Sequence, residues 1–462
     1  LRCKLEGHSV YIISHKTKYG HFDKTKTLLR EASLKWMDSQ GFFKETLYGI
    51  SKKNIFFANT QSEKVLKIKS LNLDIFVDDL EEIFLHHDFP EIKKILFSKF
   101  PLNQSNAERF NNWSDIEIAS IGAIKNNAIK NLLSSIYGES ISSIEKLKGR
   151  GNSRIYKLSF NKKNSILLKD YPDLLVDSRP RMHMEVNALK LLKGLGRTPK
   201  VLSFDKAQNI AFYEWIKGES LYKIEDHHIN QALNFIENLQ GLKGKDSWDE
   251  ASEACFSAKQ LMSQISLRFE RLLKTKNKDL NEFLVNTFKP LFKEVLKFSE
   301  KNWPGNNLEK ELPRSIHAFS PSDFGFHNTI LKDSGDLVFI DFEYFGRDDP
   351  VKLIADFIWH PGMKLNNAQK LCWIRGTFSI FKNDPELVKR FTSAWPLYGL
   401  RWSLIVLNEF LEDGWHKRAY ANDNLRHIHK QKLVSQLIKA KDICKKIHVN
   451  NMICPYIIDL NE

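Results

Sequence analysis

The order of strand-like and helix-like segments changes near residue 140, and this change limits the folds that the chain can adopt. Before that point strand-like runs alternate with helical spacing, with a helix at 28–37 and strands at 10–13, 54–58, 74–77 and 95–97. After it, strand-like runs come first, at 154–160, 165–171, 201–204 and 210–216, with one helix at 182–193, and the chain is mostly helical from about residue 226. Strand–helix alternation is typical of a parallel sheet covered by helices, whereas strands followed by helices are typical of an α+β domain. The sequence therefore predicts an α/β protein made of two different domains.

A polar segment separates the two patterns. Residues 102–118 contain four asparagines, which indicates a linker, and helical spacing follows at 121–137. We therefore expect a first domain at 1–101 and a linker with a helix at 102–139. The second domain would have a strand-rich part, 140–217, and a mostly helical part, 218–462.

The composition is that of an ordinary globular protein. The chain has 462 residues, of which 42% are hydrophobic and 27% charged, and this is enough apolar material for two to three domains. It has no run of about 18 uncharged apolar residues, so the sequence predicts no transmembrane segment. The formal net charge is +14, but the lysines are spread along the chain, which favours a solvated basic surface over a nucleic-acid site.

The cysteines and the first residues suggest where the protein works. Five cysteines are scattered without a CxxC pair, which favours a reduced, cytoplasmic protein without a structural zinc site. His8, His15 and Lys16 interrupt any signal-peptide pattern. The chain starts at Leu1, and a strand-like run begins only a few residues later. We therefore expect that further residues precede Leu1 in the parent protein.

A loop and a hairpin interrupt the helical part at residues 316–346. Asp323 and Asn328 lie five positions apart on the loop, and Asp341 follows an apolar strand after the turn 332–336. Phosphoryl transfer needs a carboxylate that takes or orients the proton of the attacking hydroxyl, and an amide and a second carboxylate that hold Mg²⁺. Because the hairpin reverses the chain, Asp341 can face the loop that bears Asp323.

The strand-rich part contains groups that suit the phosphates of a nucleotide. A short glycine loop lies between two strand-like runs, and backbone N–H groups of such a loop can approach phosphates. Lys169 lies in the following strand, where a lysine can pair with phosphate oxygens. Glu185 lies on the next helix, sixteen residues on, and could hold that lysine in place. The glycine-loop residues are Gly149, Gly151, Asn152 and Ser153.

Together these residues make the chain from about 140 to 462 resemble the aminoglycoside phosphotransferase and choline kinase family. The run Ile340–Tyr344 is most similar to the choline and ethanolamine kinase version of the family motif. The resemblance implies a protein-kinase-like, two-lobed α+β domain, with an N-terminal lobe at 140–217 and a mostly helical C-terminal lobe at 218–462. Asp356 resembles the family aspartate that braces the catalytic loop, whereas Pro321 stands where the family usually has a histidine.

The resemblance also implies a role for each residue, with ATP and Mg²⁺ as cofactors. Asp323 would be the catalytic residue that orients the acceptor hydroxyl. Asn328 and Asp341 would hold the metal. Lys169, fixed by Glu185, would contact the nucleotide phosphates, and the glycine loop would bind the same cofactor.

Each of these residues also has a structural interpretation. Asp323 could be a turn or helix-cap residue, Lys169 an exposed strand lysine, and Glu185 a solvated helix residue. We expect His317 and His327 to be structural rather than catalytic. A kinase-like domain without turnover is a further alternative, although all three positions for base and metal are filled.

The first domain has polar residues where its strands end. Ser14 follows one apolar strand, Asp78 and Asp79 follow another, and Lys64 precedes the second strand. Because parallel strands end at one edge of a sheet, these groups could gather around a phosphate and Mg²⁺. Over residues 1–101 the arrangement resembles the haloacid-dehalogenase-like phosphatase family, and it implies a partial Rossmann-like sheet.

Two features complicate that resemblance. The family's first motif, the strand-end Asp-x-Asp that supplies the nucleophile, is absent and would lie before Leu1, so we expect an incomplete phosphatase site. Lys67 and Lys69 are alternatives to Lys64, and Asp78 with Asp79 could instead cap a helix.

These observations predict a cytoplasmic, ATP- and Mg²⁺-dependent phosphotransferase that acts on a hydroxyl of a small molecule. A sugar, an amino alcohol or an aminoglycoside-like compound would be the acceptor, and no nucleic acid is expected as a partner. The first alternative is a phosphatase-like hydrolase with a regulatory or non-catalytic kinase-like domain. The second is a non-catalytic binding scaffold.

Overall fold

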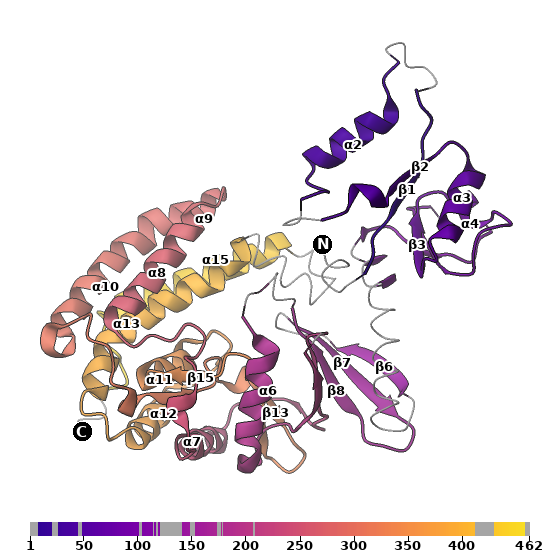
Figure 1. The fold of residues 1–462 in the computed structure, drawn as a ribbon. Helices are drawn as coiled ribbons and strands as arrows, with labels where there is room; N and C mark the ends of the chain where they lie inside the picture. The colour runs from indigo at the N-terminus through magenta and orange to yellow at the C-terminus, as the bar shows by residue number, and fades with distance from the viewer. Residues whose placement is uncertain are drawn as a thin grey trace. The chain divides into compact units, whose positions relative to one another are not determined.

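The computed structural model divides the chain into two compact units, Leu1–Ile141 and Ser142–Glu462, which we describe separately (Figure 1). The structure describes residues 8–20, 26–44, 49–100, 104–113, 115–116, 119–120, 141–147, 153–172, 177, 179–206, 208–411 and 429–457. The helix expected at 121–137 lies outside these residues.

The first unit contains two parallel sheets with helices between the strands. One sheet pairs β1 (Ile12–His15) with β2 (Ile55–Ala58), and the other has the order β3 (Ile75–Asp78), β4 (Lys93–Phe97), β5 (Glu108–Phe110). The helices are α2 (Leu29–Ser39), α3 (Gln61–Ser70) and α4 (Glu81–Phe84). One apolar cluster joins both sheets to α3, because Ile13, Val65 and Phe76 all belong to it. The expected parallel pairing is therefore present, but among the described residues it forms two sheets instead of one.

Two expectations for this unit need correction. Strand β5 lies inside the segment expected to be a linker, and it pairs with β4, with Ser98 N donating to Phe110 O at 2.9 Å. β5 has only three residues, two of them charged, and it lies at the edge of its sheet. Its sequence therefore shows no alternation of apolar and polar residues that would predict a strand. Strand β1 starts two residues later than expected, since its ladder with β2 runs from Ile12 to His15, and it therefore includes Ser14.

The second unit begins with a five-stranded sheet in which β7, β8, β10 and β9 pair antiparallel. Its strand order is β6-β7-β8-β10-β9, and α6 (Arg181–Leu192) packs on β9 and β10. The sequence predicted these elements to within two residues of their ends, except β6. The strands are β6 (Ile141–Leu147), β7 (Arg154–Phe160), β8 (Ile166–Asp170), β9 (Val201–Asp205) and β10 (Ile210–Glu214).

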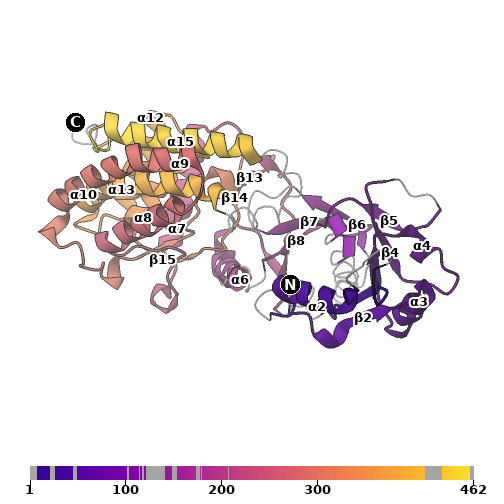
Figure 2. The same cartoon turned by 90° about the horizontal axis from the view of Figure 1, so that it is seen from above.

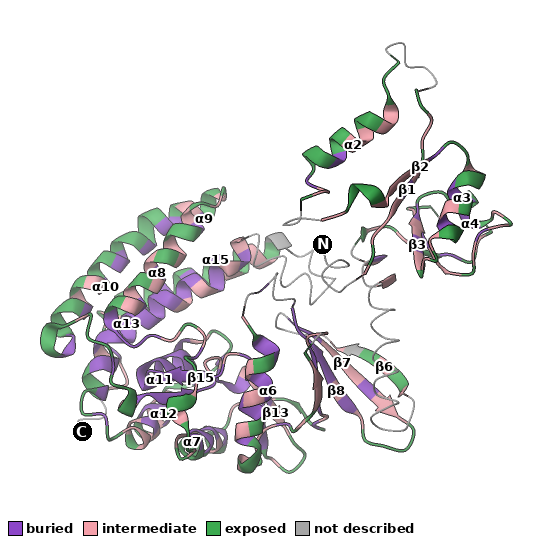
Figure 3. Ribbon diagram, viewed as in Figure 1, coloured by how far each residue is buried: buried purple, intermediate pink, exposed green. Residues whose placement is uncertain are grey.

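The rest of this unit is mainly helical, as expected. Helix α13 packs against α8, α10, α11 and α15, and Figure 2 shows α8, α10 and α15 beside it. Every residue of α11 is buried (Figure 3). The α-helices are α7 (Asp226–Gln240), α8 (Ala258–Leu273), α9 (Lys278–Phe283), α10 (Lys289–Asn302), α11 (Pro350–Trp359), α12 (Asn367–Ile380), α13 (Leu387–Ile405) and α15 (His429–Val449).

Short strands form the predicted island between α10 and α11. β12 (Ala318–Ser320) pairs with β15 (Gly346–Asp348), and β13 (Thr329–Leu331) lies between β11 (Glu219–Ser220) and β14 (Leu337–Phe339). The remaining short elements are 3-10 turns and one π-helical turn: η1 (Lys52–Asn54), η2 (Lys193–Leu195), η3 (Lys245–Ser247), η4 (Leu284–Phe288, the π turn), η5 (Pro304–Asn306), η6 (Arg314–Ile316), η7 (Phe326–Asn328) and η8 (Val406–Phe410). One core cluster runs from Tyr171 in the sheet lobe to Cys454 beyond α15, so the two lobes of this unit share a core.

Within the described part of the chain, no helix combines the length and the apolar character that a membrane crossing requires. The longest helices carry charged or polar residues throughout, for example Arg401 in α13.

Candidate active site

Asp323 lies on the loop between β12 and β13, where it contacts two other loop residues. Its Oδ1 lies 3.0 Å from His327 Nε2, and Asn328 Nδ2 donates to the Asp323 backbone oxygen at 3.0 Å. Burial alone would raise the pKa of Asp323, but the hydrogen bond from His327 lowers it to about 2. The carboxylate is therefore ionised at neutral pH, as an acceptor of a proton must be.

The hairpin brings Asn328 next to Asp341. Thr329 is paired with Phe339 in the β13–β14 ladder, and Ile340 N donates to Asn328 O at 3.0 Å. Asp341 is the next residue and has a φ of +69°. The hairpin therefore reverses the chain as predicted: Ile340, which follows β14 and precedes Asp341, bonds to Asn328 on the loop that bears Asp323.

Lys169 on β8 is surrounded by three carboxylates. Its Nζ lies 2.7 Å from Glu185 Oε2 on α6, 2.6 Å from Asp341 Oδ1, and 3.2 Å from Glu343 Oε2. The expected contact between Lys169 and Glu185 is present, and the exposed-strand interpretation of Lys169 is wrong because this side chain is buried. The solvated-helix interpretation of Glu185 is wrong for the same reason.

Buried hydrogen bonds hold Glu185 from two sides. The Tyr171 hydroxyl donates to Glu185 Oε2 at 2.6 Å and lies 2.6 Å from the hydroxyl of Tyr213. On the other side, Phe342 N donates to Glu185 Oε1 at 3.3 Å. Helix α6 is therefore tied both to the sheet and to the segment that carries Asp341.

A second cation reaches the same segment. Arg181, four residues before Glu185 on α6, is buried and forms ion pairs with Glu343 and Asp177. Burial opposes the charged form of Glu343, but Lys169 and Arg181 together lower the pKa of that carboxyl. Glu343 is thus ionised and shared between β8 and α6.

The charge balance at Lys169 favours a further cation. Burial raises the pKa of Asp341 to about 7 against the opposing effect of Lys169. Oxygens of Glu185, Asp341 and Glu343 all lie within 4.8 Å of one another, and carboxylate oxygens with an amide oxygen are the ligands that Mg²⁺ prefers. The carboxylate of Asp341 therefore fits a magnesium ion by the chemistry of its donors, and Asn328, whose backbone oxygen accepts from Ile340 N, offers an amide oxygen on the adjoining loop.

The glycine loop can be assessed at one residue only. Gly149, Gly151 and Asn152 lie outside the described residues. Ser153 is buried, and its Oγ has no hydrogen-bond partner within the described part of the chain. At this position the structure therefore shows a buried hydroxyl that no described residue bonds.

Sequence reasoning missed several residues of this site. Glu343 lies two positions after Asp341 in the run Ile340–Tyr344, so its place in that run could have suggested it. His360, from the end of α11, stacks on His327 with ring centroids 3.8 Å apart, and nothing in the sequence indicated this contact. By contrast His317 lies against the Leu312 oxygen and Arg347, in agreement with a structural role.

In the first unit, two of the four predicted residues come together. Lys64 Nζ lies 2.5 Å from Asp78 Oδ2, and both side chains are buried. Of the three candidate lysines, Lys67 is half-buried and Lys69 is exposed, so the geometry favours Lys64. Asp79 is exposed, and within the described residues neither it nor Ser14 bonds to the buried pair.

Residues 143–369 match the family model described as the phosphotransferase enzyme family. The matched range is just under half of the chain and contains Lys169, Glu185, Asp323, Asn328 and Asp341. The match confirms the predicted class of enzyme, a small-molecule phosphotransferase. It does not include the first unit.

Solved structures give weaker likenesses, and no curated relative matches the chain. A choline kinase from Streptococcus pneumoniae is 15% identical, with a TM-score of 0.45, over 70% of this chain and 99% of its own. A choline/ethanolamine kinase family protein from Mesorhizobium loti is 17% identical, with a TM-score of 0.44, over 69% and 94%. A thermostable mutant of an aminoglycoside phosphotransferase is 13% identical, with a TM-score of 0.43, over 69% and 98%. At such scores we base no conclusion on these structures.

Proposed function

We propose that the second unit transfers the γ-phosphoryl group of ATP to a hydroxyl of a small molecule and requires Mg²⁺. The observation that carries this proposal is the buried Lys169, held by Glu185 and Glu343 and directed at Asp341. A lysine fixed between carboxylates of two lobes is the arrangement that phosphoryl transfer needs to hold nucleotide phosphates.

The chemistry would use Asp323 and Lys169 in separate roles. The ionised Asp323 accepts a hydrogen bond from the acceptor hydroxyl and takes its proton as the oxygen bonds to the γ-phosphorus. The bond between the γ-phosphorus and the bridging oxygen breaks, and ADP leaves with that electron pair. Lys169 keeps the phosphates in line during this step. Mg²⁺, held by Asn328 and Asp341, would neutralise charge on the phosphate oxygens.

The acceptor stays a prediction, as a sugar, an amino alcohol or an aminoglycoside-like compound. We propose that the reaction takes place in the cytoplasm. Four cysteines of the described residues, Cys255, Cys372, Cys444 and Cys454, are free thiols, which agrees with a reducing compartment.

Two substitutions test the proposal. Asp323→Ala should lower turnover about 100-fold or more and leave Mg-ATP binding nearly unchanged, because a positioned base acts mainly in the transition state.

Asp341→Asn should nearly abolish turnover and weaken the dependence on Mg²⁺, because an amide lacks the charge of the carboxylate. The measurements are ADP release with a panel of acceptors and calorimetric titration with Mg-ATP.

A matched control is available in the same hairpin. Asp333 lies in the turn, and its side chain is 81% exposed, so Asp333→Ala should behave like the parent protein. Normal turnover of Asp323→Ala on an accepted substrate would overturn the assignment of the base. An Asp341→Asn variant that responds to Mg²⁺ as the parent does would remove Asp341 from the metal site.

We propose a separate phosphate-binding edge for the first unit, in a partial Rossmann-like, haloacid-dehalogenase-like arrangement. The buried pair of Lys64 and Asp78 at the end of β3 supports it. Residues 1–101 contain no Asp-x-Asp, so we expect this chain to show no turnover of generic phosphate esters with Mg²⁺. Phosphatase turnover that persists after Asp78→Ala and Asp79→Ala would contradict this interpretation.

A further inference from the structure

The backbone just before Asp323 is strained and has few bonds of its own. Pro321 has no N–H and no side-chain donor. Ser322 has a φ of +64°, a left-handed conformation that is unfavourable for a residue with a β-carbon. Other parts of the fold must therefore hold this turn in place.

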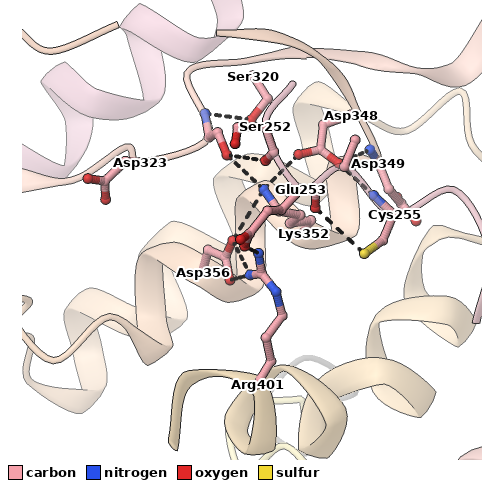
Figure 4. A network of polar contacts seen from close by, with 12 residues as sticks. Ser252, Glu253, Cys255, Ser320, Asp323, Asp348, Asp349, Lys352, Asp356 and Arg401 are labelled. Carbon is pink, nitrogen blue, oxygen red and sulfur yellow. Dashed lines mark hydrogen bonds and ion pairs between the residues drawn. The ribbon is translucent and has the colours of Figure 1, made fainter. Parts of the chain in front are cut away.

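Three hydrogen bonds hold Ser322. Its N–H donates to Ser320 Oγ at 3.0 Å, and its hydroxyl donates to the Ser252 oxygen at 3.0 Å. The third bond comes from Lys352 on α11, whose Nζ donates to Ser322 Oγ at 3.0 Å. Figure 4 shows Lys352 at the centre of this network, with Asp323 at its edge.

Lys352 is itself fixed from all sides. It is 1% exposed, and its Nζ lies 2.7 Å from Asp348 Oδ2 and 3.5 Å from Asp356 Oδ2. An ammonium group has three donors, and these two carboxylates and the Ser322 hydroxyl provide three acceptors. Burial opposes the charge of Lys352, but Asp348 and Asp356 outweigh it and raise the pKa of the amine.

A neighbouring arginine balances the remaining charge. Arg401 Nη1 lies 3.2 Å from both carboxylate oxygens of Asp356, and Arg401 Nη2 lies 2.9 Å from Glu253 Oε2. Asp356, which by the family resemblance would brace the catalytic loop, makes no hydrogen bond or ion pair with residues 321–328, all of which the structure describes, and is connected to that loop through Lys352.

We propose that Lys352 is a positioning residue for the transfer reaction: through Ser322 it sets the turn that places the Asp323 carboxylate. This inference rests on the proposed function of Asp323. Lys352 stands on a fully buried helix and does not reach the reacting atoms. Its hydrogen bond to Ser322 fixes the loop to α11. A displacement of the Asp323 carboxylate by about 1 Å can lower the rate roughly 100-fold.

The test separates positioning from folding. Lys352→Met would leave two buried carboxylates with one cation fewer, which is strongly destabilising, so the first variant is Ser322→Ala. We expect at least about a tenfold slower ADP release from Mg-ATP, with the dissociation constant of Mg-ATP within about twofold of the parent. Choline, ethanolamine, glucose and kanamycin are the acceptors to be tried. If none of them is phosphorylated, the rate measured is the hydrolysis of ATP, with water as the acceptor.

A double-mutant cycle provides the decisive readout. If Ser322 acts through Asp323, Ser322→Ala should change the rate little when Asp323→Ala is already present. An equal loss in both backgrounds, or an unchanged rate for Ser322→Ala alone, would overturn the inference. A parent-like rate for Asp323→Ala alone would instead overturn the proposed function.

Two further variants keep the result interpretable. Ser322→Gly removes the same hydroxyl but adopts the positive φ without strain, so it should be more stable than Ser322→Ala and still turn over slowly. A parent-like rate in this folded variant would also overturn the inference. Ser334→Ala, in the exposed turn of the neighbouring hairpin, is the matched control and should have no effect.

Discussion

Three residues around the site, Glu253, Ser322 and Asp341, have left-handed backbone angles although none of them is glycine. Each is held by side-chain contacts: Glu253 by Arg401, Ser322 by Lys352 and Asp341 by Lys169. Such conformations persist where the surroundings over-determine them, and they are concentrated at functional sites. The buried cations of the site therefore also stabilise the left-handed backbone of the residues that they contact.

The first prediction concerns Glu185. In Glu185→Gln, Lys169 loses one charged partner and should be drawn further toward Asp341 and Glu343. We expect roughly tenfold weaker binding of Mg-ATP, since a charge-assisted hydrogen bond contributes about 1.5–3 kcal/mol. Calorimetric titration measures this change. Glu237→Gln on the exposed face of α7 is the control, and equal affinities for the two variants would contradict the prediction.

The second prediction concerns pH. Burial opposes ionisation of Glu253, but Arg401 and Arg268 lower its pKa to about 2. A carboxylate with a lowered pKa stabilises the fold fully above its unfolded value near 4.5, and this contribution is lost as the pH falls through about 2. Glu253→Gln should therefore be less stable than the parent at pH 7, with a smaller difference at pH 3. Urea unfolding at both values tests it, and a constant difference would refute it.

At the scale of elements, β15 and α11 link the catalytic loop to the core. Asp349 caps α11 by accepting from Val351 N at 2.8 Å, and Pro350 occupies the first turn, where its missing N–H costs nothing. Strand β15 pairs with β12, whose last residue precedes the catalytic loop. The loop is therefore flanked by a strand on one side and a buried helix on the other.

The third prediction tests this packing at Gly346 in β15. A β-carbon there would lie 2.4 Å from Ala251 N and 2.6 Å from the Glu250 carbonyl carbon, and both atoms belong to the backbone. Gly346→Ala should therefore lower the free energy of unfolding by about 1–3 kcal/mol. Urea unfolding measures the change.

Gly194 is the control for this substitution. A β-carbon there meets nothing within 4 Å, so Gly194→Ala should stay within about 0.5 kcal/mol of the parent. If Gly346→Ala and Gly194→Ala are equally stable, β15 does not lie as close to residues 250–251 as the structure shows.

At the scale of the whole molecule, the two units have separate hydrophobic cores. Among the described residues, one cluster contains buried residues between Ile13 and Ala107, the other between Tyr171 and Cys454, and they share no residue. Each unit therefore has the buried surface that independent folding requires.

The fourth prediction follows from these separate cores. Residues 140–462, expressed alone, should unfold cooperatively and bind Mg-ATP with the affinity of the full chain. Circular dichroism on heating and calorimetric titration check both properties. A chain that does not unfold cooperatively, or that binds Mg-ATP much more weakly, would show that the second unit depends on the first.

Much of the second unit could be predicted from the sequence, because its signals are local. Strands β7 and β8 follow from alternation over a few residues, and the spacing of Asp323, Asn328 and Asp341 follows from one loop and one hairpin. Local patterns failed where a strand has only three residues, two of them charged, as in β5, and where two sheets are present instead of the single predicted one, as for β1 and β3.

The pairing of Lys169 with Glu185 could be predicted from the sequence, but only the tertiary structure decided that Asp341 and Glu343 also contact this lysine. Lys169 and Asp341 are 172 positions apart, and no periodicity relates a strand lysine to a hairpin carboxylate. The carboxylates that pair with Lys352, Asp348 and Asp356, are four positions before and after it, so helical spacing indicates them. Its bond to Ser322 joins residues 30 positions apart, and only the packing of α11 against the loop determines it.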